Sequence, residues 1–225
     1  MARSPIRGAN PNVMSIWISS GGPLRIWTAL ALLSTLPGCT ADMAGVAGSR
    51  ALSVSGGAVT VAGPAGYCVD KGASKDGSAG AFVLLGTCAA MTRSTGAGPT
   101  VAPAILTASV IPGAPDEGPL SAVFPSTARF FRSAPGRKAL SRNGRPENVE
   151  VADVISKGEV LYIRLRDTSE SAGQSVEPEY WRAILSLRGR IVTLSALALR
   201  DRPLTSSAKR KVLEAFVARM QATNT

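Results

Sequence analysis

The strongest constraint in this sequence is the pattern of apolar and polar residues between positions 149 and 199. Short turns at residues 156–158 and 188–190 interrupt this pattern. They separate two pairs of apolar or alternating segments, residues 149–151 and 160–166, then 181–187 and 191–199. Such segments joined by short turns are typical of antiparallel hairpins. The region therefore predicts two successive hairpins that form an antiparallel meander.

The segment 160–166 has two different faces, because side chains alternate between the sides of a strand. One face consists of Leu161, Ile163 and Leu165, and the other of Tyr162, Arg164 and Arg166. The first face is expected to be buried and the second to contact solvent.

An amphipathic helix is predicted after the meander, with Thr205 or Ser206 as its N-cap. Apolar residues recur in it at a spacing of three or four, namely Val212, Leu213, Phe216, Val217 and Met220. The opposite side is expected to carry Lys209, Arg210 and Lys211. Since a sheet and an amphipathic helix bury their apolar faces together, we expect an α+β fold in which the helix packs on the meander.

The N-terminal half predicts shorter elements. A hairpin around Gly56-Gly57 is expected to precede a strand at residues 67–69, a solvated loop at 70–80 and a buried strand at 81–86. A further strand is expected at 104–111, followed by helices within 120–131 and 137–142. Three prolines in residues 112–119 mark a possible sub-boundary within one α+β domain, residues 52–225.

An apolar run near the N-terminus predicts export. Residues 26–38 contain no charge, and their number suits a signal peptide but is short of the roughly 20 residues of a membrane-spanning helix. Arg3, Arg7 and Arg25 precede this run, and no acid occurs before Asp42. We expect residues 1–38 to be removed; translation from Met14 instead of Met1 would preserve the signal.

The motif Leu36-Pro37-Gly38-Cys39 resembles the lipobox of bacterial lipoproteins, although Pro37 stands where that family more often has Ala, Ser or Thr. The resemblance implies that Cys39 carries the lipid at the start of the mature chain, with residues 39–51 as a flexible tether. Thr40 in place of Asp implies sorting to the outer membrane, facing the periplasm. The alternatives are an ordinary secretion signal cut nearby, for instance after Ala41, and a retained anchor.

Cys68 and Cys88 remain as an even pair in a compartment that oxidises thiols. We therefore expect a disulfide that pins an N-terminal hairpin. Two buried free thiols are the alternative, and a zinc site is set aside because two cysteines without histidine supply too few ligands.

Two further resemblances concern larger segments. The order of strands and helix in the last third resembles PsbP and Mog1-like domains, which have an antiparallel sheet with a C-terminal helix across it. The segments 66–70 and 82–90 around the two cysteines resemble a stretch of bacterial envelope lipoproteins. These resemblances imply a fold and a location, and they imply no activity.

The composition limits the classes of function. The chain has 25 basic and 15 acidic residues and no histidine. Without histidine it lacks the commonest general base and the commonest metal ligand, so no metal and no cofactor are expected. Removing residues 1–38 removes three arginines and no acid, which leaves a basic mature chain. Behind a signal peptide its anionic partners would be lipids, glycans or acidic proteins, and no nucleic acid is expected.

A cluster of cations without an intervening acid is the best candidate for a binding site. It consists of Arg129, Arg132, Arg137, Lys138, Arg142 and Arg145. Clustered guanidinium groups favour phosphate or carboxylate partners, and Phe130 and Phe131 are expected to turn inward and hold the segment down. The alternative is a solvated basic face that contributes to solubility.

Signals for catalysis are weaker. Ser206 and Lys209 have the Ser-x-x-Lys spacing of penicillin-recognising enzymes, but the partner motifs of that class are missing. The acidic pairs Asp70 with Asp76 and Glu177 with Glu179 lie in segments expected to be solvated, and no catalytic residue is assigned. We therefore expect a lipid-anchored, non-enzymatic binding or structural protein of the bacterial envelope. The alternatives are an envelope serine hydrolase and an accessory subunit of an envelope assembly.

Overall fold

The computed structural model describes residues 49–92, 101–113, 118–169 and 175–225, which belong to one compact unit. The predicted signal peptide, Cys39 and most of the tether lie outside the described residues. None of the helices in the described ranges combines the length and apolar character that crossing a bilayer requires.

A seven-stranded antiparallel sheet forms the centre of this unit, with the strand order β3-β4-β5-β9-β8-β7-β6. The strands are β3 (Tyr67–Gly77), β4 (Gly80–Thr87), β5 (Ala104–Pro112), β6 (Val149–Lys157), β7 (Val160–Asp167), β8 (Glu179–Leu187) and β9 (Arg190–Ala198). Strands β6 to β9 are the predicted meander, and β5 joins it at β9. The α+β class and the antiparallel meander are confirmed.

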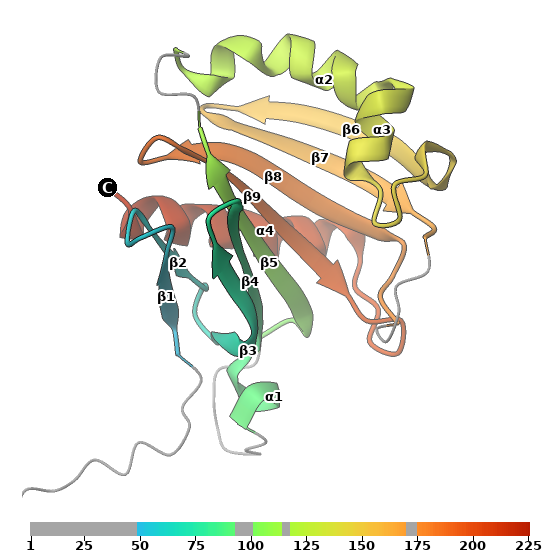
Figure 1. Cartoon of the computed structure of the whole chain (residues 1–225). Helices are drawn as coiled ribbons and strands as arrows, with labels where there is room; N and C mark the ends of the chain where they lie inside the picture. Colours follow the sequence, from blue (N-terminus) through green and yellow to red (C-terminus); the bar gives the residue numbers. More distant parts are fainter. Residues whose placement is uncertain (1–48, 93–100, 114–117, 170–174) are drawn as a thin grey trace, which may run out of the picture. The chain divides into compact units, whose positions relative to one another are not determined.

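The remaining elements lie around this sheet. Two short strands, β1 (Ala51–Val54) and β2 (Val59–Ala62), pair as a separate hairpin. The helices are α1 (Cys88–Thr92), α2 (Phe124–Arg132), α3 (Ala134–Leu140) and α4 (Ser206–Thr223), with short 3-10 turns η1 (Leu120–Val123) and η2 (Pro146–Asn148). Figure 1 shows α4 on one face of the sheet, and α2 and α3 on the other.

The larger core lies between the sheet and α4. Leu213, Phe216 and Met220 of α4 are fully buried there, together with strand residues such as Leu106 and Leu194. Valines of β1 and β2 complete this core, because β2 packs against α4. The predicted packing of the C-terminal helix is confirmed, and its N-cap is Thr205, whose side chain accepts a hydrogen bond from the backbone N–H of Ala208.

A second core covers the other face of β6, β7 and β8. Phe124 and Leu140 of α2 and α3 are buried there against Leu161, Ile163 and Leu165 of β7. The expectation that the opposite face of β7 contacts solvent is wrong at its start, because Tyr162 lies buried in the core under α4. Helices cover both faces of β7, so residues on both faces of this strand are buried and must be largely apolar there.

Lys209 also departs from the prediction, since it is almost fully buried instead of lying on the solvent face of α4. The reason is helical geometry: Lys209 precedes Leu213 by four residues and therefore shares its face. Its Nζ donates hydrogen bonds to Glu177 Oε2 at 3.1 Å and to the Glu179 carbonyl at 2.9 Å. Glu177 and Glu179, which were expected to be solvated charges without a role, thus hold the first turn of α4 on the sheet.

The predicted disulfide between Cys68 and Cys88 is confirmed, with the two Cα atoms 4.8 Å apart. It joins the start of β3 to the start of α1, directly after β4, and so pins the β3–β4 hairpin. The expectation of a loop at residues 70–80 is wrong, because β3 continues to Gly77 after an irregularity between Asp70 and Lys75. Its side chains there remain largely exposed while its backbone pairs with β4, which is why composition alone indicated a loop.

Candidate functional site

The predicted cation cluster lies on α2, α3 and the segment that follows them, and the second core holds this segment in place. Phe131 packs inward against that core. Ser133 ends α2 and caps α3, because its hydroxyl accepts a hydrogen bond from the backbone N–H of Gly136. Gly136 also permits the two helices to touch, since a Cβ atom at this position would lie 1.9 Å from the Phe130 carbonyl oxygen. The turn therefore holds α2 and α3, which carry these cations, against each other.

Four of the six predicted cations are exposed, and we call them the arginine face: Arg129, Arg132, Lys138 and Arg145. Within the part of the chain that the structure describes, none of these four side chains forms an ion pair with a carboxylate. Their charges are therefore available to a partner.

The other two predicted cations serve the structure. Arg137 is partly buried, and its guanidinium donates hydrogen bonds to the backbone carbonyls of Arg132 at 2.6 Å and Pro146 at 3.3 Å. Arg142 lies over the Tyr180 ring at 5.0 Å from its centroid, and its Nε lies 3.8 Å from the buried carboxylate of Asp167. Arg137 therefore joins α3 to the segments before and after it, and Arg142 holds the end of this segment against β7 and β8.

The two neighbouring phenylalanines point in different directions, which corrects the expectation that both turn inward. Phe131 is partly buried, whereas Phe130 is 47% exposed. Consecutive residues on a helix are about 100° apart, so both rings cannot face one core. Val123, two helical turns before Phe130, is 46% exposed. The arginine face therefore has apolar side chains beside its charges.

A cavity of about 370 Å³ adjoins the arginine face at the edge of the sheet. Arg132 and Arg137 line one part of it, and residues 149–151 of the edge strand β6 line the rest. The cavity extends the arginine face onto β6, where Glu150 adds one exposed acid.

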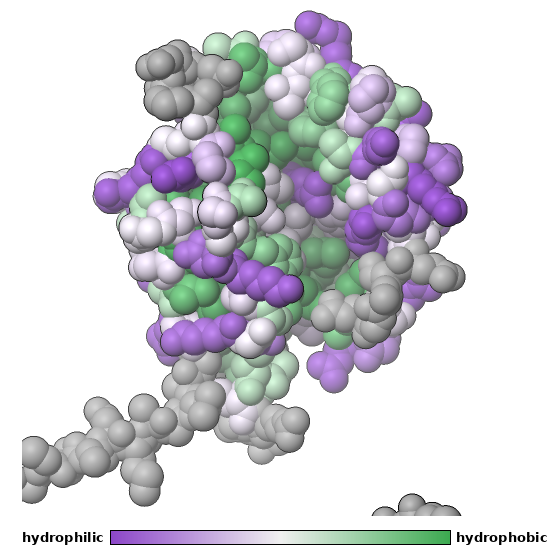
Figure 2. Space-filling view, in the orientation of Figure 1, coloured by the Kyte–Doolittle hydropathy of each residue, from purple (hydrophilic) through white to green (hydrophobic). Residues whose placement is uncertain are grey.

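The face of the sheet beside α2 and α3 is partly uncovered. Phe82 of β4 is 40% exposed and Ile111 of β5 is 46% exposed, and Leu84 and Ile105 on the same side are partly exposed. Figure 2 looks onto this face and shows apolar residues gathered over the middle of the sheet, with hydrophilic residues on both sides. The helices thus cover the β6–β8 part of this face more fully than the β4–β5 part.

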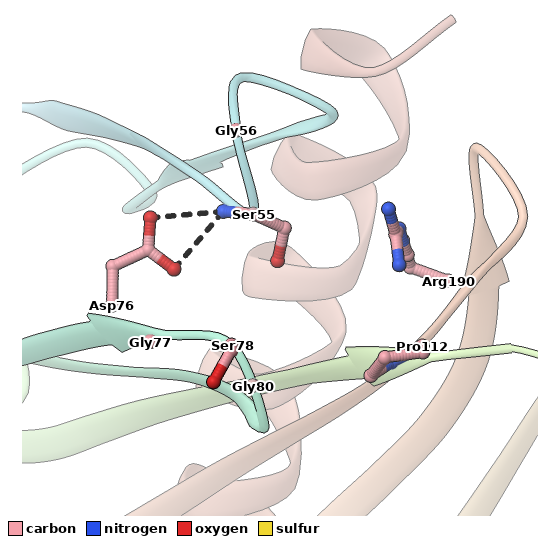
Figure 3. A pocket seen from close by; sticks show the side chains of 8 residues that line it. All are labelled: Ser55, Gly56, Asp76, Gly77, Ser78, Gly80, Pro112 and Arg190. Carbon is pink, nitrogen blue, oxygen red and sulfur yellow. Dashed lines mark hydrogen bonds between the residues drawn. The ribbon is translucent and has the colours of Figure 1, made fainter.

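A polar pocket of about 340 Å³ lies between the hairpin turns at one end of the sheet, and Figure 3 shows it from close by. Ser55 of the β1–β2 turn, Asp76 of β3, Ser78 of the β3–β4 turn and Arg190 of β9 line it, with Pro112 of β5. Asp76 had no predicted role, and no pattern in the sequence connects these residues. The Gly56-Gly57 turn was a local signal, but only the strand order brings the segments together.

Ser206 and Lys209, which have the spacing of a catalytic pair, both have structural partners. The hydroxyl of Ser206 accepts a hydrogen bond from Trp181 Nε1 at 3.0 Å. The ammonium of Lys209 donates to Glu177 and to the Glu179 carbonyl, as described above. Both side chains are thus engaged in contacts that hold α4 on the sheet, so this pair gives no support to a hydrolase.

Comparison with models of protein families, with curated proteins and with solved structures found no match for this chain. The sequence resemblances to lipoproteins and to PsbP and Mog1-like domains therefore stay predictions.

Proposed function

We propose that this protein is a lipid-anchored component of the bacterial envelope, in the outer membrane and facing the periplasm, which binds an acidic partner protein and catalyses no reaction. The observation that carries this proposal is the arginine face, whose four exposed cations lack carboxylate partners in the described residues and lie on the same segment as exposed Phe130 and Val123.

Exposed cations beside exposed apolar side chains suit a protein partner. Aromatic residues and arginine are enriched in protein interfaces, where an apolar centre excludes water and charges at the rim set specificity and association rate. Arginine can also bind a carboxylate through two parallel hydrogen bonds. A partner surface with acidic residues around an apolar patch would complement both parts of this face.

The tether favours a partner away from the anchoring membrane. Ser49 pairs with Val69 of β3, at one edge of the sheet, whereas α2 contacts β6 at the opposite edge. Six intervals between neighbouring strands amount to about 29 Å along the sheet. Nine residues lie between Cys39 and Ser49, so the ten steps from Cys39 to Ser49 span at most about 35 Å when fully extended. Because the tether joins the sheet at the β3 edge and the arginine face lies at the β6 edge, this face is more easily presented to the periplasm than to the headgroups around the anchor.

Photo-crosslinking in cells tests this proposal. A photoreactive amino acid in place of Phe130 should form an adduct with one protein, and the adduct should disappear when Arg129, Arg132, Lys138 and Arg145 are all changed to Gln. The matched control removes four other exposed cations, by changing Lys71, Lys75, Lys211 and Arg219 to Gln. This control should retain the adduct.

Two outcomes would contradict an acidic protein partner. The first is an adduct that persists equally in both variants. The second is purified protein that sediments with peptidoglycan or with anionic vesicles and loses this property only in the arginine-face variant, which would assign the face to a glycan or to lipid.

The location is tested separately with Cys39→Ala. This variant should no longer be processed to a lipidated form, and the wild-type protein should fractionate with outer-membrane markers in a sucrose gradient. A processed variant that still fractionates with membranes would show that Cys39 is not the anchor.

A further inference from the structure

The Ser55 turn, which forms one wall of the pocket between the hairpin turns, is held by hydrogen bonds. Ser55 has a φ of 56°, in the left-handed region that residues with a Cβ atom rarely occupy, and Gly56 and Gly57 continue this turn. The Asp76 carboxylate holds the turn, because both of its oxygens accept the backbone N–H of Ser55, at 3.1 and 3.0 Å. Strained backbone that is held by a specific contact is often found at functional sites.

The β1–β2 hairpin is also fixed from the C-terminal end of α4. The side chain of Asn224 accepts a hydrogen bond from the Thr60 N–H at 2.8 Å and donates one to the Thr60 carbonyl at 2.9 Å. Arg188 in turn donates to the carbonyls of Asn224 at 3.0 Å and Thr225 at 2.6 Å. The β1–β2 hairpin, which contributes Ser55 to the pocket, is therefore held in place by contacts within the protein.

Arg190 contributes a cation to this pocket. Its side chain is partly buried, and among the described residues no carboxylate or carbonyl accepts a hydrogen bond from its guanidinium. Arg188, two residues earlier, shows the contrast, because the C-terminal residues satisfy it. Figure 3 shows Arg190 and Asp76 on opposite sides of the pocket, with the Ser55 hydroxyl between them. A partly buried guanidinium without a partner is suited to a carboxylate ligand.

We infer that this pocket binds a small zwitterion of the amino-acid or short-peptide class. The ligand carboxylate would pair with Arg190, and its ammonium group with Asp76. The hydroxyls of Ser55 and Ser78 can donate or accept hydrogen bonds between these two ends. Asp76 disfavours a ligand that is only anionic, and Arg190 disfavours one that is only cationic. A volume of about 340 Å³ suits such a molecule, and this site is independent of the arginine face.

The experiment is a titration of the full-length chain in detergent micelles, followed by the amide NMR signals of Gly56, Gly77 and Gly80. The probes are alanyl-alanine, its N-acetyl form without the ammonium, and its C-terminal amide without the carboxylate. We expect saturable shifts with the zwitterion, and binding at least about tenfold weaker for each modified form, since each leaves one protein charge unpaired.

Variants separate the two ends of the ligand. Arg190→Gln should weaken binding of alanyl-alanine at least about tenfold but leave binding of the amide unchanged, because the amide lacks the group that Arg190 would bind. Asp76→Asn keeps an acceptor for the Ser55 N–H. It should weaken binding of alanyl-alanine at least about tenfold but leave binding of the N-acetyl form unchanged, because that form lacks the ammonium. Arg219→Gln, an exposed cation on α4, is the control.

Three results would overturn the inference. They are no saturable shift at millimolar alanyl-alanine, equal binding of all three probes, and wild-type affinity in a folded Arg190→Gln variant. The thermal midpoint of each variant shows that it is folded, and the series of modified probes remains decisive in the wild-type protein if a variant does not fold.

Discussion

Lys209 and its two acidic partners allow a sharp test of the energetics of this fold. The side chain of Lys209 is 3% exposed, whereas those of Glu177 and Glu179 are 21% and 33% exposed. Water therefore reaches the carboxylates but hardly reaches the ammonium. The two sides of this cluster should respond differently when the other side is removed, and we compare Lys209→Met with the double change Glu177→Gln and Glu179→Gln.

The expected magnitudes follow from this difference in exposure. Lys209→Met replaces a buried charge with an apolar side chain of similar length and leaves two carboxylates that water can solvate, so it should cost about 1–2 kcal/mol of unfolding free energy. The double Gln variant leaves a buried ammonium with neutral acceptors only. Breaking a buried pair in this way should cost about 3–5 kcal/mol.

Urea denaturation of the four proteins measures these costs. In the triple variant the buried ammonium and both carboxylates are absent, so it should be more stable than the double Gln variant. The reasoning would be refuted if Lys209→Met destabilised the protein more than the double Gln change, or if the triple variant were the least stable of all.

Three further predictions concern stability. Replacing Cys68 and Cys88 with Ala should lower the unfolding free energy by about 3 kcal/mol, since the disulfide closes a loop of 20 residues; an unchanged urea midpoint would count against this. Burial raises the pKa of Tyr67 from 10.0 to about 12. The folded state therefore keeps this proton when the unfolded chain releases it, and stability should be full below about pH 10 and fall by up to about 3 kcal/mol towards pH 12. Tyr67→Phe should lack this part of the alkaline loss in a pH series of melting curves. Gly136→Ala should cost about 3 kcal/mol, because its Cβ atom would lie 1.9 Å from a carbonyl oxygen of α2, whereas Gly118→Ala, with no atom within 4 Å, should be neutral in the same assay.

The sequence by itself determined the elements whose signals are local. Alternation and short turns predicted the β6–β9 meander. Side chains alternate along a strand with a period of two residues, and two strands joined by a tight turn pair in an antiparallel way. The 3.6-residue repeat and the cap at Thr205 predicted α4 and its apolar face in the same way. An even pair of cysteines behind a predicted signal peptide was enough to predict the disulfide between Cys68 and Cys88.

Only the tertiary structure decided which surfaces these elements cover and which ends they bring together. Helices on both sides of β7 buried Tyr162, and the rotation of α4 placed Lys209 towards the core with Glu177 as its partner. The packing of α2 turned one of two adjacent phenylalanines, Phe130, to solvent. Asp76 and Arg190 are 114 residues apart in the chain, and they line one pocket because β9 pairs with β5 and the β1–β2 turn lies against β3. Contacts of this kind depend on packing between distant segments, which no local repeat in the sequence encodes.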